Sequence, residues 1–184
     1  MAKLILSLAG EMACGKGTAV KYLVKKYDAG SFRFSTILRD VLDRLCLEQS
    51  RENIQKLSTI LRKNFSDDLL AGVMAEDVKK DTAEIVVIDG VRRLADIKYL
   101  SGLPEFKLVY IETELERRHE RIVKRGENTD DAQKTLGDFK KEHVSESELQ
   151  IGDLKNHADF LIDNNGSPED LYVQLDKIVN ENTR

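Results

Sequence analysis

The feature that most constrains this chain is a glycine-containing loop near its start, at residues 10–15. An apolar run, residues 4–8, precedes the loop, and apolar positions at helical spacing follow it over residues 20–27. Gly10 and Gly15 allow the backbone to fold back so that successive N–H groups point into one concavity, where the following helix presents its positive end. The order of strand, glycine loop and helix therefore predicts a cradle for the phosphates of a ligand.

The loop has the spacing of a Walker A motif, G-x-x-x-x-G-K, in which Lys16 adds a mobile positive charge. It departs from the motif at one place, because Gly17 follows the lysine and the hydroxyl comes one residue later, at Thr18. We therefore expect Mg²⁺ to be held mainly through water and an acidic residue from a later strand, with Thr18 turned towards a phosphate. The expected nucleotide contacts from this segment are Gly10, Ala13, Cys14, Gly15, Lys16, Gly17 and Thr18.

Length and composition indicate an ordinary single domain. The chain has 184 residues, of which 41% are hydrophobic and 34% charged. Its net charge of −4 argues against a nucleic-acid partner, because such a partner requires a basic face. No segment approaches the roughly 20 apolar residues of a membrane helix, and no signal-peptide pattern is present. We therefore expect a cytoplasmic protein without a membrane partner, whose oligomeric state the sequence leaves open.

Apolar runs alternate with helical patterns along the whole chain. This alternation predicts a three-layer α/β fold, in which a parallel sheet of five strands is covered by helices on both faces. The expected strands are residues 4–8, 32–34, 84–89, 106–111 and 158–163. The expected helix caps are Ser50, Ser66, Thr113 in a capping box with Glu116, and Ser167, and Gly126 is expected to end the helix that follows Thr113.

Two segments stand out from the expected core. Residues 36–83 carry three helical patterns and are far longer than a simple crossover, which suggests a helical sub-domain over one side of the sheet. Residues 127–150 are mostly polar, with Leu136 and Phe139 among the few apolar positions, and predict a mobile helical flap rather than core. The core would then comprise residues 1–35, 84–126 and 151–184.

Asp89 comes at the end of an apolar run typical of a strand buried on both faces. Because parallel strands gather their carboxyl ends at one edge of the sheet, we expect Asp89 beside the glycine loop. There it could orient Mg²⁺ or its waters, so that Asp89 and Thr18 are the candidate metal residues; a helix N-cap is the alternative role of the aspartate.

Several arginines follow the ends of expected strands. The transition state of phosphoryl transfer is rich in negative charge, and stabilising it requires cations from several sides. Any one arginine could be solvated surface, but the positions of these cations past strand ends and before the flap favour a site. They are Lys16 on the loop, Arg39 after the second strand, Arg92 and Arg93 after the third, and Arg121 and Arg125 before the flap.

With these motifs in view, the chain resembles the P-loop nucleoside monophosphate kinases. Within them it is similar to the shorter group related to deoxynucleotide monophosphate kinases and dephospho-CoA kinases. The order Gly15-Lys16-Gly17-Thr18 resembles that of adenylate-kinase-like enzymes. Four further segments carry the resemblance: residues 34–40 resemble the acceptor-binding turn, 89–93 the D-G-x-x-R element, 121–125 the R-x-x-x-R approach to the lid, and 158–166 the strand and loop lining the adenine.

The resemblance covers residues 3–175 and implies a P-loop fold and an ATP- and Mg²⁺-dependent kinase. The acceptor it implies is small and phosphorylated, a nucleoside or deoxynucleoside monophosphate. It implies catalytic roles for Lys16, Arg93, Arg121 and Arg125, nucleotide contacts by Arg121 and Asn165, and acceptor contacts by Ser35, Thr36, Arg39, Arg92 and Arg93. The chain departs from the pattern in its flap, which has no long β-rich lid and offers Lys140 and Lys141 where related proteins often place an arginine.

Two alternative functions stay open. A dephospho-CoA kinase-like enzyme would phosphorylate a sugar hydroxyl and would need a general base, for which Asp40 and Asp89 are candidates. A nucleotide-binding regulator would bind ATP without transferring its phosphoryl group. The guanine-specific N-K-x-D motif of a GTPase is absent from the sequence.

Overall fold

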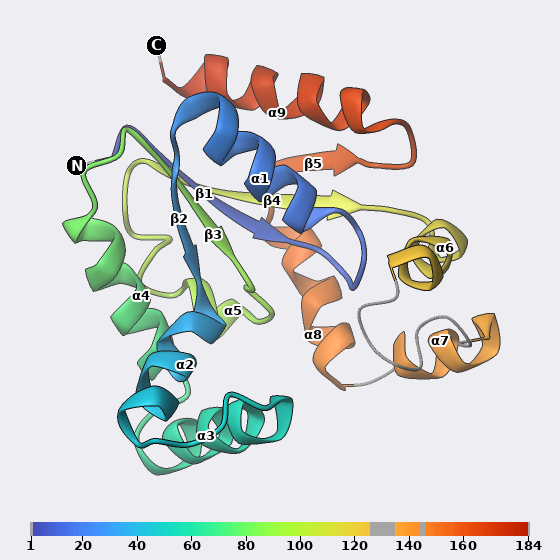
Figure 1. The fold of residues 1–184 in the computed structure, drawn as a ribbon. Helices are drawn as coiled ribbons and strands as arrows, with labels where there is room; N and C mark the ends of the chain where they lie inside the picture. Colours follow the sequence, from blue (N-terminus) through green and yellow to red (C-terminus); the bar gives the residue numbers. More distant parts are fainter. Residues whose placement is uncertain (1, 126–134, 144–145, 184) are drawn as a thin grey trace.

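The computed structural model describes residues 2–125, 135–143 and 146–183, without the side chains of 125, 141–143 and 146–149. Its centre is one five-stranded parallel sheet in the order β2-β3-β1-β4-β5, which confirms the expected fold class (Figure 1). The strands are β1 Leu4–Ala9, β2 Gly30–Arg33, β3 Ile85–Asp89, β4 Phe106–Glu112 and β5 Phe160–Asp163.

The register of the sheet brings three strand ends together around β1. Leu8 of β1 lies beside Asp89 of β3, and Ala9 lies beside Tyr110 of β4. All six residues of β1 are buried, because helices cover both faces of the sheet. The chain leaving β1 therefore enters the glycine loop with the ends of β3 and β4 on either side of it.

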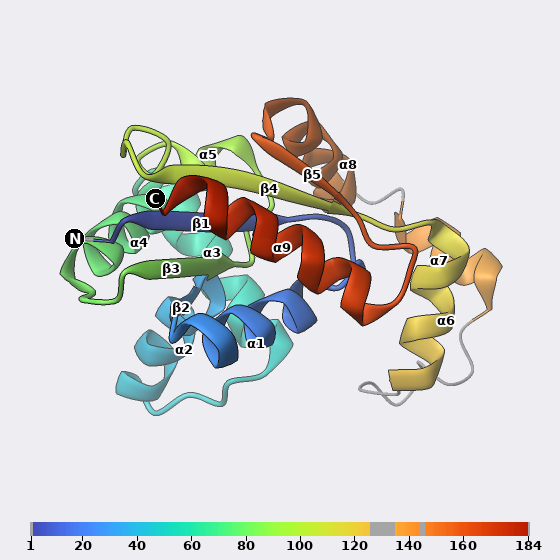
Figure 2. The same ribbon diagram turned by 90° about the horizontal axis from the view of Figure 1, so that it is seen from above.

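Helices α1, Lys16–Tyr27, and α9, Pro168–Asn182, cover one face of the sheet, as Figure 2 shows from above. Alternation along β1 points Leu4, Leu6 and Leu8 at this layer. They pack in one buried cluster with Leu23 of α1 and Leu175 of α9. Helix α9 begins as expected, because the Ser167 hydroxyl accepts the N–H of Asp170 and Pro168 is its first residue.

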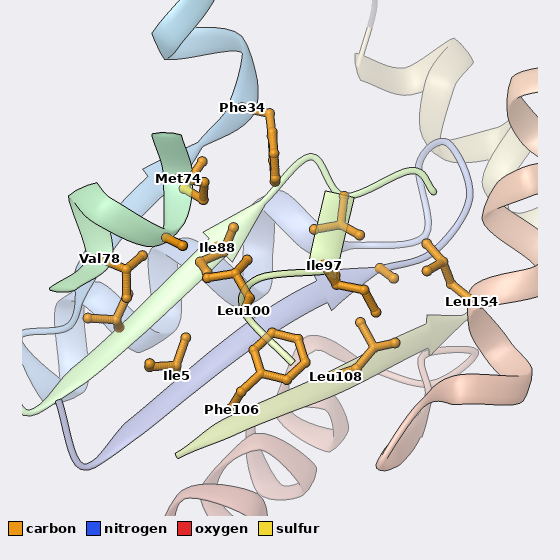
Figure 3. Packing of buried hydrophobic residues seen from close by; sticks show 14 of the residues in the cluster. Ile5, Phe34, Met74, Val78, Ile88, Ile97, Leu100, Phe106, Leu108 and Leu154 are labelled. Carbon is orange, nitrogen blue, oxygen red and sulfur yellow. The ribbon is translucent and has the colours of Figure 1, made fainter. Parts of the chain in front are cut away.

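Helices α2, Phe34–Arg44, α4, Leu69–Lys80, α5, Leu94–Ile97, and α8, Glu146–Asp153, with the 3-10 turn η2, Leu154–His157, contribute to the opposite layer. Figure 3 shows part of this core, where Met74 and Val78 of α4 and Ile97 of α5 lie over Ile5 and Ile88 of the sheet. Helix α5 was not expected from the sequence, because a single turn of helix leaves too short an apolar pattern to be recognised.

The remaining helices lie at the two sides of the sheet's carboxyl edge. Helix α3, Arg51–Asn64, packs on α2 in the helical insertion and has no buried residue of its own. Its expected cap is confirmed, because the N–H of Asn53 donates to the Ser50 hydroxyl at 3.2 Å. Helices α6, Leu115–Arg125, and α7, Leu136–His143, lie side by side beyond β4 in both views (Figure 1, Figure 2).

Three local expectations need correction. Strand β2 begins and ends earlier than expected, because Phe34 is the first residue of α2 and is buried in the core. Ser66 is not a helix cap: Asp68 stands directly before α4, and the Ser66 hydroxyl donates to its carboxylate at 2.7 Å. The flap was expected to lie outside the core, yet Phe139 is only 2% exposed.

The expected boundaries of the flap are only partly within the described residues. Gly126, expected to end the preceding helix, lies outside them, and so do residues 127–134 and 144–145. Helix α8 runs across the expected boundary at residue 150, and its Ile151 belongs to the core. Among the helices of the described residues, none is long and apolar enough to span a membrane.

Candidate functional site

The glycine loop has the backbone conformation that its sequence predicts. Gly10 and Gly15 have φ values of 139° and 110°, and Ala13 between them also has a positive φ of 61°. A Cβ atom on Gly10 would lie 2.4 Å from the Ile111 carbonyl oxygen, and one on Gly15 would lie 2.2 Å from Asn164 Nδ2. Glycine is therefore required at both positions by conformation and by space.

Lys16, the first residue of α1, reaches back across the loop. Its Nζ donates to the carbonyl oxygen of Gly10 and, at 3.0 Å, to that of Glu11. The Sγ atom of Cys14 lies 3.6 Å from the same nitrogen. The lysine charge thus stands over the loop, where a phosphate could take the place of these backbone oxygens as its partner.

The carbonyl oxygen of Cys14 is the point at which the rest of the fold holds the loop. It accepts hydrogen bonds from Thr113 Oγ1 at 3.0 Å, from Asn164 Nδ2 at 2.7 Å and from Arg121 Nη1 at 3.4 Å. Arg121 also donates from Nη2 to the Asn164 carbonyl at 2.8 Å. Because Thr113 and Asn164 are buried, these bonds are shielded from water and fix the loop to the ends of β4 and β5.

One sequence expectation changes at this point, and another stays a prediction. Helix α6 begins at Leu115, so Thr113 is not its cap, and the hydroxyl bonds Cys14 and the Asn164 carbonyl instead. Asn165, the expected nucleotide contact, accepts the N–H of Glu114 at 2.8 Å and donates to Asp163. The asparagine that reaches the loop is its neighbour Asn164.

Arg118 is a second buried contact to the loop. Its side chain is 2% exposed, and its Nη2 atom lies 3.0 Å from the Glu11 carboxylate. Its Nε donates to the Thr113 carbonyl at 3.1 Å, and Nη1 donates to the Met12 carbonyl at 3.5 Å. Arginines of α6 therefore meet the loop from two sides, Arg118 near its start and Arg121 near its end.

Asp89 lies at the end of β3, as expected, and has an arginine partner from the neighbouring strand. Arg33 donates to Asp89 Oδ2 from Nε at 3.0 Å and approaches the same oxygen with Nη2 at 2.7 Å. Both contacts use Oδ2, so among the described residues Oδ1 is left for another ligand. This arrangement follows from the register, which places Arg33 directly beside Asp89.

These residues fit a hydrated Mg²⁺ ion bound together with a nucleotide. Mg²⁺ usually keeps several waters and takes one or two carboxylates plus phosphate oxygens. The described residues contain no group of three or more His, Cys, Asp or Glu that could hold a metal by itself. Asp89 therefore provides one carboxylate oxygen at the loop's edge, and Thr18 provides an exposed hydroxyl in the first turn of α1.

The expected acceptor-side residues lie on α2 and on the segment after β3. Ser35 is half-buried in the first turn of α2, and Thr36 next to it is exposed. Arg39 is exposed one turn further on and donates to Gln49 Oε1 at 3.0 Å. Arg92 is exposed as well, so its guanidinium is open to solvent.

Arg93 and Arg62 share one buried carboxylate, that of Asp96. Asp96 is 3% exposed, and each arginine places an Nη2 atom 3.2 Å from its Oδ1. The backbone N–H groups of Arg92 and Arg93 donate to Oδ2 at 3.0 Å and 3.2 Å. Arg93 also pairs with Asp67 at 2.7 Å. Burial raises the pKa of the Asp96 carboxyl, while the N–H of Arg92 and the Arg62 guanidinium oppose that rise.

Three residues of this site, Arg33, Arg118 and Asp96, were not singled out from the sequence, while Asn164 was expected as part of the adenine-lining loop. Arg33 lies within the expected second strand, but its place beside Asp89 follows from the pairing of β2 with β3, which the sequence did not predict. Arg118 had a usable signal, since it follows Leu115 by three residues and precedes Ile122 by four, which places an arginine on the apolar side of α6. Asp96 had no signal beyond lying near the predicted residues Arg92 and Arg93. The side chain of Arg125, expected to be catalytic, lies outside the described residues.

The loop, the parallel sheet and the arginine-bearing helix define a P-loop protein of the nucleoside-monophosphate-kinase-like superfamily. The chain belongs to the family described as an AAA domain, whose model matches residues 9–140. This family and the kinase-like fold support nucleotide-dependent phosphoryl transfer.

The chain is also similar to known proteins in sequence and to solved structures in fold. The chain is 31% identical over 183 residues to a UPF0200 protein of Thermococcus kodakarensis and 28% identical over 180 residues to one of Methanocaldococcus jannaschii. These alignments cover 97% of this chain each, and 97% and 90% of the two relatives. Its fold resembles a crystal structure of TT1252 from Thermus thermophilus, with a TM-score of 0.62, 15% identity and 98% coverage of both chains. It also resembles shikimate kinase from Acinetobacter baumannii in complex with shikimate, with a TM-score of 0.55, 16% identity and coverage of 97% and 94%.

Proposed function

We propose that this protein is a kinase that uses ATP and Mg²⁺ to phosphorylate a nucleoside or deoxynucleoside monophosphate. The observation that carries the proposal is the glycine loop held by hydrogen bonds to its Cys14 carbonyl. Lys16 lies over this loop, and the ends of β2 and β3 lie beside it. This arrangement supports binding of a triphosphate at the end of β1 and of an acceptor across the ends of β2 and β3.

On the donor side, the loop amides and Lys16 would bind the β- and γ-phosphates, with Arg121 at the end of the loop. Arg121 now donates to two backbone carbonyls, one from the loop and one from Asn164. From there it can orient the loop and provide positive charge beside the nucleotide. Arg125, one helical turn further along α6, would add a second charge as part of the same proposal.

On the metal side, Asp89 would hold Mg²⁺ or its waters through Oδ1, while Arg33 keeps Oδ2 in place. When bound, Mg²⁺ neutralises charge on the phosphate oxygens. Thr18 lies in the first turn of α1 and would contact a phosphate or a metal-bound water. No residue needs to form a covalent intermediate, because holding donor and acceptor in line lowers the barrier.

On the acceptor side, Ser35, Thr36, Arg39, Arg92 and Arg93 would bind the monophosphate. Two of these arginines, Arg39 and Arg92, are exposed, and a doubly charged phosphate is the ligand that such a set favours. A hydroxyl acceptor, as in a dephospho-CoA kinase-like reaction, is the second candidate. The observation in its favour is that Asp89 lies at the strand end where such a reaction needs a base.

The proposal can be tested by an ADP-release screen with Mg²⁺ and ATP. Ribo- and deoxyribonucleoside monophosphates, dephospho-CoA and shikimate would be offered as acceptors, and ATP binding would be measured separately by titration calorimetry. We expect turnover with one or more monophosphates. Lys16→Met should lower that turnover by about 10³-fold, because it removes a cation from the transferred phosphate.

Lys21→Met is the matched control, because Lys21 is an exposed lysine on the same helix. It should leave both ATP binding and turnover unchanged. Turnover with only dephospho-CoA or shikimate would replace the monophosphate proposal by the hydroxyl one. ATP binding without turnover on any acceptor would indicate a regulator, and failure of the wild-type protein to bind ATP would refute the proposal.

A further inference from the structure

Arg118 is the most deeply buried charged residue in the described part of the chain. Its guanidinium meets three oxygen atoms from two segments: the Glu11 carboxylate and Met12 carbonyl of the glycine loop, and the Thr113 carbonyl after β4. The Glu11 side chain is itself only 20% exposed. A planar guanidinium suits such a set of acceptors, because its donors diverge in fixed directions.

The other side of Arg118 is covered by α7. The ring of Phe139 lies over the guanidinium, with 5.6 Å between the Arg118 Cζ atom and the ring centroid. Phe139 is 2% exposed, and its ring also contacts that of His119, with a centroid distance of 5.8 Å and an interplanar angle of 44°. Figure 1 shows α7 lying against α6, the helix that carries Arg118.

We propose that Arg118 is a positioning residue that couples α7 to the phosphate-binding loop. The same guanidinium pairs with Glu11 of the loop and packs under Phe139 of α7. An arginine–carboxylate pair is stronger where water is excluded, so Phe139 strengthens the hold of Arg118 on Glu11 by covering it. In return, the pair with Glu11 holds the guanidinium within reach of the ring of Phe139.

This coupling works in both directions, because linkage between two sites is reciprocal. Loss of the Glu11 carboxylate should loosen α7, although Glu11 is not part of that helix. Loss of the Phe139 ring should weaken nucleotide binding at the loop, although Phe139 is not part of the loop. A residue that only stabilised its own segment would produce neither of these distant effects.

The first experiment measures hydrogen exchange of the α7 amides in the protein without nucleotide. Glu11→Gln and Arg118→Lys should each speed exchange over residues 136–143 by about tenfold, within the range of coupling seen between linked sites. Arg117→Lys is the matched control, because Arg117 precedes Arg118 on α6 but is exposed. It should leave this exchange unchanged. If Glu11→Gln altered the exchange of the glycine-loop amides but left that of residues 136–143 unchanged, the inference would be overturned.

The second experiment measures ATP affinity by calorimetry and rests on the proposed function. Phe139→Leu keeps an apolar side chain over Arg118 but removes the ring, and it should raise the Kd for ATP severalfold; Phe139→Ala should raise it by about tenfold. Unfolding curves of each variant check that the fold is intact. An unchanged Kd in folded Phe139→Ala would overturn the inference. If wild-type protein bound no ATP, the proposed function would fail, while the exchange experiment would still test the coupling.

Discussion

The two sides of the candidate site are held by different kinds of contact. On the donor side, a backbone carbonyl of the loop accepts bonds from Thr113, Asn164 and Arg121, two of which are buried. On the acceptor side, Arg93 pairs with the carboxylates of Asp67 and Asp96, and Arg39 is exposed and bonds an amide oxygen. The loop is thus fixed through its main chain, while the acceptor-side arginines are held through their charged ends.

This difference determines which contacts must change when a ligand binds on each side. Bonds to the Cys14 carbonyl fix the backbone of the loop, so the donor site is shaped before the ligand arrives, and only Lys16 has to exchange its carbonyl partners for a phosphate. An arginine paired with a carboxylate must exchange that partner, or share it, when an anionic acceptor binds. We therefore expect the donor side to be preorganised and the acceptor side to gain its final arrangement on binding.

The largest expected effect tests how the acceptor-side arginines are held. Asp96→Ala should lower the free energy of unfolding by about 3–5 kcal/mol, because it leaves buried charge and two backbone N–H groups without their partner. Asp67→Ala is the control, since the Asp67 side chain is 63% exposed, and it should cost less than about 1 kcal/mol. Urea denaturation of both variants measures the difference. Equal losses would show that the buried carboxylate does not hold this segment.

Gly15→Ala tests whether the donor loop depends on its shape. The methyl group would meet Asn164 Nδ2 in a backbone conformation with φ of 110°, so we expect ATP affinity to fall by about 100-fold, equivalent to about 2.7 kcal/mol. Gly17→Ala is the control, because a Cβ there meets nothing within 4 Å. Calorimetric titration with ATP checks both. Normal affinity in Gly15→Ala would contradict a loop fixed before the ligand binds.

A third prediction concerns the support of α1 behind the loop. Lys26, Tyr22 and Tyr27 of α1 all bond the Asp176 carboxylate of α9. Burial alone would raise the pKa of Asp176, but the hydrogen bonds from Lys26, Tyr27 and Tyr22 lower it. Burial together with Asp176 raises the pKa of Tyr27 to about 12. Asp176→Asn should therefore cost about 1–2 kcal/mol of unfolding free energy at pH 7.

The pH dependence of this cost has a definite sign. A carboxylate with a lowered folded-state pKa stabilises the protein above its unfolded pKa of about 4 and loses that contribution as the pH falls through the folded value. The stability gap between wild type and Asp176→Asn should therefore be constant from pH 5 to 8 and shrink below about pH 4. Denaturation curves at several pH values test this. A gap that persists in acid would mean that the charge of Asp176 does not matter.

The smallest expected effect is at the exposed edge of the acceptor side. Arg39→Ala should raise the KM for the monophosphate by about fivefold, because an exposed ion pair contributes about 1 kcal/mol, and should leave the KM for ATP unchanged. Arg44→Ala, which removes another exposed arginine of α2, is the control. If only the KM for ATP changed, Arg39 would belong to the donor side of the site and not to the acceptor side.

Sequence reasoning predicted those parts of the molecule that depend on local order. The glycine spacing, the buried run before Asp89 and the caps at Ser50 and Ser167 each lie within a few residues, and the structure agrees with them. Asp96 and the bond from Asn164 to Cys14 were missed because the partners Arg62 and Cys14 lie far away in the chain. Phe139 was assigned to a polar flap, because its burial depends on a charged residue, Arg118, that is itself buried.

The hold on the Cys14 carbonyl also determines the direction of an amide. In a planar trans peptide the carbonyl oxygen of one residue and the N–H of the next point in opposite directions. With the Cys14 oxygen turned towards Thr113, Asn164 and Arg121, the Gly15 N–H is turned away from them. Three side chains from the second half of the chain thereby set the direction of an N–H donor, that of Gly15, in the first half. A rotation of this one peptide plane would remove that orientation.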